Sequence, residues 1–155
     1  MENLKYRMYY ILAYNLSSIQ KGVQATHAIA RYARDYGSNQ DYMEWINNHE
    51  TAIFLDGGTS NSTYNSKTGE YKGSLNNILA LIKMKQIFVS AFYEEDANNM
   101  LTCIAVLADE RVWDTKKYPD PLLETESEYK NYIERVGGEQ NSFLRQLLLP
   151  LKLAV

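Results

Sequence analysis

The sequence predicts an α/β fold with a mixed four-stranded sheet flanked by helices. The first observation is a continuous apolar run, residues 9–14, because such a run is typical of a strand covered on both faces. The second is the helical period of residues 18–36, which follow that run across a short turn. The third is the tight connection between the apolar runs 87–93 and 101–107, which predicts two antiparallel strands.

The other elements of the first two thirds follow in order. Residues 41–48 predict a second short helix, residues 51–55 a second strand, and residues 75–84 a third helix. Between the last two, residues 59–73 are polar and read as an insertion. A long loop of this kind is often a lid or binding loop, and the alternative is a mobile surface segment.

Within this insertion, Tyr64 and Tyr71 are placed to face each other across a small hairpin. Their rings are therefore candidates to stack on a nucleobase, or they simply cover the edge of the sheet.

The last third, residues 114–155, predicts a C-terminal helical extension of the same single domain. A polar connector precedes a helix at residues 123–136, and a last helix starts at Ser142 and is broken by Pro150. The apolar residues of this tail exceed what one last helix usually needs, so we expect a homodimer or larger assembly. They are Phe143, Leu144, Leu147, Leu148, Leu149, Leu151 and Leu153.

Composition narrows the class of protein. The chain has 155 residues and a formal net charge of −3, which weighs against binding nucleic acid by charge alone. Cys103 is the one cysteine, so no internal disulfide forms, and no leader or membrane-length apolar run is present. We therefore expect a cytoplasmic protein that does not enter the membrane. No metal-ligand spacing is present, and we predict no metal or cofactor.

The helix at residues 18–36 carries a polar ridge on one side. At about 100° per residue, this ridge consists of Gln20, Gln24, His27, Arg31 and Arg34. The next two faces round the helix predict a wide buried arc. It consists of Ile19, Val23, Thr26, Ala30 and Ala33 on one face and Ala25, Ile29, Tyr32 and Tyr36 on the other. The end of the first strand and the start of this helix would meet at one place, which is the usual ligand site of open α/β sheets.

Several short motifs together resemble the type 2 peptidyl-tRNA hydrolase family. That family carries Gln-x-x-His-Ala on its first helix, as residues 24–28 do here. Its Asp-Ala-Gly turn resembles residues 96–98, its threonine-containing last strand residues 102–106, and its closing helix residues 147–153. The family's lysine four residues before the motif glutamine is replaced here by Gln20, with Lys21 beside it.

The resemblance implies the family's fold and a site built around the motif. The implied catalytic residues are His27, Lys21, Asp96 and Thr102. The ligand-binding candidates are Gln20, Gln24, Arg31, Arg34, Tyr64 and Tyr71. A histidine suits general acid–base work near neutral pH, and arginines suit phosphate groups. Each has a structural alternative, as a capping, turn or solvated surface residue.

Three functional hypotheses follow. The first is a small hydrolase acting on a nucleotide or on a tRNA-linked ester or phosphodiester. The second is a non-catalytic binder on the same fold that sequesters a nucleotide-derived signal, as a phage-type counter-defence protein would. The third is a purely structural partner module that uses the leucine-rich tail.

Overall fold

The computed structural model describes residues 3–60, 64–65, 67, 70–71, 73–122 and 125–155. Its central sheet has four strands, β1 (Tyr6–Leu12), β2 (Ala52–Asp56), β5 (Val89–Glu94) and β6 (Met100–Asp109). Their order across the sheet is β2-β1-β6-β5. Strand β2 is parallel to β1, whereas β6 is antiparallel to both β1 and β5. The predicted mixed sheet and the antiparallel last pair are therefore confirmed.

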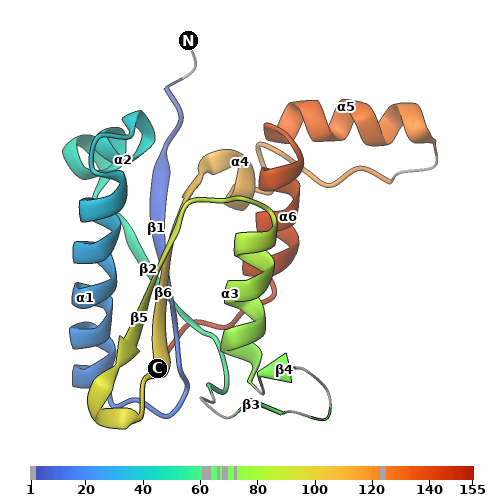
Figure 1. Cartoon of the computed structure of the whole chain (residues 1–155). Coiled ribbons are helices and arrows are strands. Elements are labelled where there is room, and N and C mark those ends of the chain that lie inside the picture. Colours follow the sequence, from blue (N-terminus) through green and yellow to red (C-terminus); the bar gives the residue numbers. More distant parts are fainter. Residues whose placement is uncertain (1–2, 61–63, 66, 68–69, 72, 123–124) are drawn as a thin grey trace.

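Helices cover both faces of this sheet (Figure 1). One face carries α1 (Ser18–Tyr36) and α2 (Gln40–Glu44), which continues into a π-helical turn, η1 (Trp45–His49). The other carries α3 (Ser74–Met84), α4 (Glu110–Trp113) and α6 (Glu139–Leu148), and α5 (Glu126–Val136) projects beside α6. None of the helices in the described part of the chain is long and apolar enough to cross a bilayer.

Strand β1 lies at the centre of both core layers. Ile11 packs with α3 and α6, whereas Met8 and Leu12 pack with α1, and all three are 0% exposed. Burial on both faces explains why this stretch is continuously apolar, since each such side chain contributes about 1.5–3 kcal/mol. The strand begins earlier than the apolar run suggests, and Tyr14, beyond its end, is 57% exposed.

The end of the chain pairs with the outer edge of β2. Leu153 forms an antiparallel bridge with Leu55, and the backbone N–H of Ala154 donates to the oxygen of Phe54 at 2.9 Å. The backbone N–H of Asp56 donates to the oxygen of residue 152 at 2.8 Å. This last segment therefore behaves as an added strand that covers the edge of the sheet.

The apolar tail is mostly used inside the chain. Leu144 and Leu148 are buried, and Phe143, Leu147 and Leu151 pack against the same core cluster. Leu149 and Leu153 remain exposed. The apolar side chains from which a homodimer was expected are therefore mostly packed into this chain's own core.

The remaining boundaries differ slightly from the expected ones. Strands β3 (Tyr64–Asn65) and β4 (Glu70–Tyr71) pair through Tyr64 and Tyr71, so the predicted hairpin is confirmed. Helix α5 begins at Glu126 because Thr125 and Glu128 form a capping box. Helix α6 begins at Glu139, not Ser142.

Candidate functional site

Helix α1 faces the sheet with only part of the arc that was expected to be buried. Its buried residues are Lys21, Gln24, Ala25, Ala28 and Tyr32, at the spacing of one helical face. Of the two faces predicted to be buried, that of Ala25 and Tyr32 lies inside. The other is largely exposed, since Ile19 is 81% and Val23 46% exposed, and Thr26 and Ala30 are exposed as well. The buried face contains a lysine and a glutamine because both find hydrogen-bond partners there.

Gln24, predicted on an exposed ridge, is the centre of a buried polar network. Its Nε2 donates to Oε2 of Glu94 at 2.9 Å, and its Oε1 accepts from the Thr102 hydroxyl at 2.8 Å. The Thr102 hydroxyl also lies 3.3 Å from the backbone oxygen of Phe92. The structure thus brings two of the predicted site residues together, and it adds Glu94, which sequence reasoning missed. In both contacts between the side chains of Gln24, Glu94 and Thr102, a donor faces an acceptor.

Lys21 does not approach this network as a free amine. The side chain is buried, with the residue 8% exposed, and Nζ donates a hydrogen bond to the backbone oxygen of Val155. Lys21 therefore holds the end of the chain against α1, and its catalytic role stays a prediction.

His27 and Arg31 both lie against one phenyl ring, that of Phe92. The exposed His27 ring stacks on Phe92 with centroids 4.4 Å apart, and the Arg31 guanidinium lies 4.8 Å from the centre of the same ring. Arg31 also donates to the backbone oxygen of Ala91 at 3.3 Å, as Tyr36 does to Val89 at 3.2 Å. These contacts satisfy backbone groups of β5 at the edge of the sheet.

Gln20 and Arg34 lie apart from the network, and Asp96 reaches it only through its backbone N–H, which donates to Oε1 of Glu94 at 3.5 Å. Gln20 accepts from the backbone N–H of Ser17 at 2.9 Å and completes the capping box of α1. Arg34 is paired with its neighbour Asp35 at 2.8 Å on the surface. Asp96 is exposed in the 3-10 turn η2 (Glu95–Ala97).

The predicted base-stacking role of two tyrosines lies outside what the structure describes. The backbone of Tyr64 and Tyr71 belongs to the β3–β4 pair, but their side chains are not among the described parts.

A pocket lies elsewhere, at the end of the sheet where β6 extends past β5. Strand β5 begins at Val89, opposite Val106, whereas β6 continues to Asp109. Residues 107–109 therefore pair with β1 alone, and their other edge is open. The chain before β5 turns away at Gln86, whose φ is 57°. The space left beside β6 is a pocket of about 320 Å³.

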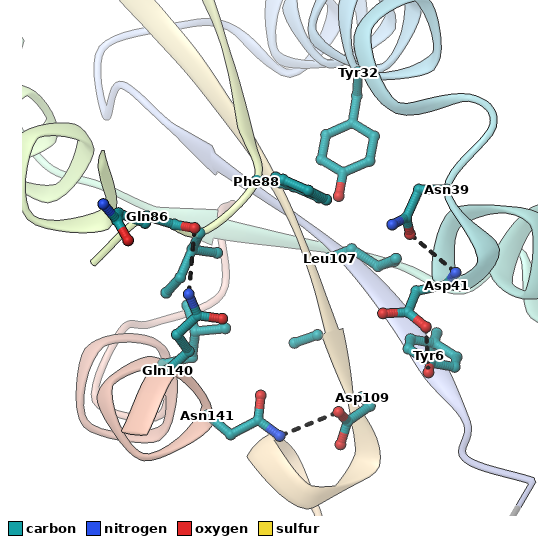
Figure 2. A pocket seen from close by; sticks show the side chains of 13 residues that line it. Tyr6, Tyr32, Asn39, Asp41, Gln86, Phe88, Leu107, Asp109, Gln140 and Asn141 are labelled. Carbon is teal, nitrogen blue, oxygen red and sulfur yellow. Dashed lines mark hydrogen bonds between the residues drawn. The ribbon is translucent and has the colours of Figure 1, made fainter. Parts of the chain in front are cut away.

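The pocket has an aromatic wall and a polar rim (Figure 2). Its aromatic side chains are Tyr6, Tyr32 and Phe88. Its amides are Asn39, Gln86, Gln140 and Asn141, and its carboxylates are Asp41 and Asp109. The volume lies at the small end of the range for small-molecule sites, roughly 300–1,000 Å³.

Most rim side chains are held by bonds to neighbouring groups. Asp109 accepts from Arg111 through both of its oxygens at 3.0 Å, and the paired carboxylate raises the pKa of that guanidinium. Nδ2 of Asn141 donates to the same carboxylate at 3.1 Å. Asn39 caps α2 by accepting from backbone N–H groups of that helix. The rim is therefore fixed in advance of any ligand, which lowers the entropic cost of binding.

Tyr32 is the pocket's most unusual polar group. The residue is only 3% exposed, yet its hydroxyl points into the cavity in Figure 2. Among the described residues, no group forms a hydrogen bond with this hydroxyl. Burial, with an added effect of the Asp41 charge, raises the pKa of Tyr32, so the hydroxyl keeps its proton. Because the hydroxyl faces the cavity, a water or a ligand can serve as its partner.

Sequence reasoning did not find this pocket. The helical period places Tyr32 on the inner apolar face of its helix, and this pattern gives no indication of a role for its hydroxyl. The available signal was a pair of adjacent amides, Gln140 and Asn141, at the start of a helix otherwise rich in leucine. Within the described residues, no group of three or more His, Cys, Asp or Glu side chains is placed to hold a metal ion.

Comparison with models of known protein families gave no match to this chain. Comparison with curated proteins gave no match either.

Proposed function

We propose that the protein is a non-catalytic binder of a nucleotide-derived small molecule, whose base is held in the pocket beside β6. The observation that carries this proposal is the Tyr32 hydroxyl, which faces the pocket, keeps its proton and has no hydrogen-bond partner among the described residues. A ligand that accepts from this hydroxyl would gain a hydrogen bond that the free protein makes only with water.

The residue types around Tyr32 support a planar, hydrogen-bonding ligand. Tyr36 stacks against the Phe88 ring with the two centroids 4.7 Å apart. Phe88 is still 51% exposed, so its ring offers aromatic surface to a ligand. Aromatic faces stack on nucleobases, and asparagine and glutamine side chains read the hydrogen-bonding edges of bases. An aromatic wall beside a rim of amides therefore suits the base of a nucleoside.

The alternative hydrolase has less support at the α1–β5 face. Thr102 donates its proton within the buried network, and Lys21 is bound to the end of the chain. Asp96 is exposed, and His27 stacks on Phe92. A nucleophile with an adjacent base is the usual mark of covalent hydrolysis, and the described contacts of these four side chains do not form one.

The order of elements and the motif around Gln24 still support a fold like that of the type 2 peptidyl-tRNA hydrolases. We infer that this chain uses such a fold to sequester a ligand, which is the activity expected of a counter-defence protein.

The test is a ligand panel together with a turnover assay on the wild-type protein. We expect at least one nucleoside or nucleotide to raise the melting temperature, because a ligand that binds only the folded state stabilises it. We expect no cleavage of peptidyl-tRNA or of cyclic dinucleotides. Turnover that is lost in His27→Ala would instead establish the hydrolase.

A further inference from the structure

We infer that the pocket beside β6 binds the part of its ligand that carries hydrogen-bond donors, whether that part is uncharged or cationic. Any phosphate of the ligand stays outside the pocket. This inference rests on the proposed function, and it names the chemical class of ligand that enters. A planar ring with exocyclic amino groups, such as an amino-bearing nucleobase, belongs to this class. A phosphate or carboxylate does not.

Two of the four rim amides, Gln140 and Asn141, offer oxygens to the ligand because their nitrogens are already used, whereas Asn39 uses its oxygen to cap α2. Nε2 of Gln140 donates to the backbone oxygen of residue 85 at 3.0 Å, and Nδ2 of Asn141 donates to the backbone oxygen of Val136 at 2.7 Å. These partners are carbonyls, so they require the donor end of each amide. Figure 2 shows the oxygens of Gln140 and Asn141 on the side of the cavity.

Asp41 adds a charged acceptor on the opposite wall. One of its oxygens, Oδ1, accepts from the Tyr6 hydroxyl at 2.9 Å. That contact, together with burial, raises the pKa of Tyr6, so its hydroxyl stays a donor to the carboxylate. In the part of the chain that the structure describes, Oδ2 accepts no hydrogen bond. One full negative charge therefore borders the cavity with a free oxygen.

Among the described residues that line the pocket, no positive charge balances it. The 13 residues that line the pocket include Asp41 and Asp109 but no lysine or arginine. Arg111, which holds Asp109, is engaged by both oxygens of that carboxylate. An anion placed here would meet acceptors and like charge, whereas a donor-bearing ring would find Gln140, Asn141 and Asp41.

The experiment compares matched ligands on the full chain by calorimetry. The ligands are adenosine, cytidine and uridine, the 5′-monophosphates of the first two, and benzamidine, a planar aromatic cation that is not a nucleoside. The variants are Asp41→Asn and, as a control, Asp96→Asn, which makes the same change on an exposed carboxylate in η2.

We expect adenosine or cytidine to bind more tightly than uridine, which has no exocyclic amino group, and the 5′-phosphate to give no gain in affinity. Asp41→Asn should lower the affinity for that nucleoside by about tenfold or more, because a hydrogen bond to a charged acceptor is lost. Asp96→Asn should leave the affinity unchanged.

The outcomes separate this inference from the proposed function. A monophosphate that binds about tenfold tighter than its nucleoside overturns the inference while leaving a nucleotide binder in place. Benzamidine binding that Asp41→Asn removes, with no nucleoside bound, supports the donor preference and overturns the proposed function. If none of these ligands binds, both are overturned.

Discussion

Replacement of Arg145 by methionine is expected to lower the free energy of unfolding by about 3 kcal/mol or more, because two backbone oxygens each lose a charged hydrogen-bond donor worth about 1.5–3 kcal/mol. Arg145 is 2% exposed and donates to the backbone oxygens of Arg111 at 2.7 Å and Tyr118 at 2.8 Å. It also pairs with Asp120 at 2.7 Å, but that carboxylate is 67% exposed and also accepts from the Tyr132 hydroxyl. Methionine keeps the apolar stem but leaves the two backbone oxygens without this donor.

The contact matters for the pocket because Arg145 anchors α6, the helix that carries Gln140 and Asn141. The matched control is Arg135→Met on α5, where an exposed arginine donates to the backbone oxygen of Pro119 at 3.0 Å. Chemical denaturation of both variants is the measurement, and the control should lose no more than about 0.5 kcal/mol. Equal losses would show that the burial of Arg145 has no energetic role.

Replacement of Gln24 by methionine is the second large effect, an expected loss of about 1–3 kcal/mol in the free energy of unfolding. The substitution leaves the Thr102 hydroxyl bonded only to the backbone oxygen of Phe92. It also removes the Gln24 amide as a donor to the half-buried Glu94 carboxylate. Gln20→Met, four residues earlier on the same helix, removes an exposed capping contact and should cost less than about 1 kcal/mol.

The Gln24 variant also separates a structural role from a role in binding. We expect the folded fraction to bind the ligand of the pocket with unchanged affinity, since Gln24 does not line the pocket. Loss of binding at full occupancy of the folded state would instead place the ligand at the α1–β5 face.

The fold was largely predictable because its signals are local. The apolar run around Tyr10, the helical period of α1 and the tight β5–β6 turn each depend on residues close in sequence. The inward face of α1 was not predictable from polarity. Lys21 and Gln24 are buried because Val155, Glu94 and Thr102 supply partners from distant segments, which leaves the apolar Ile19 and Val23 outside.

The pocket was not predictable for a related reason. The pocket exists because β6 is longer than β5, which leaves the edge of β6 open at Leu107. The residue at which a strand ends is poorly defined by sequence. Its polar groups come from α1, from the loop before α2 and from α6, and Asn141 lies more than a hundred residues after Tyr32 along the chain. Only the completed topology brings them together.

If the ligand binds beside β6 and not beside His27, the shift in melting temperature that it induces should depend on Tyr32. The shift is measured for Tyr32→Phe and His27→Ala side by side with Tyr36→Phe, which removes a tyrosine hydroxyl outside the pocket. Tyr32→Phe is expected to lose most of the shift, while His27→Ala and Tyr36→Phe retain it. A shift that survives in Tyr32→Phe and disappears in His27→Ala would instead place the ligand at the α1–β5 face.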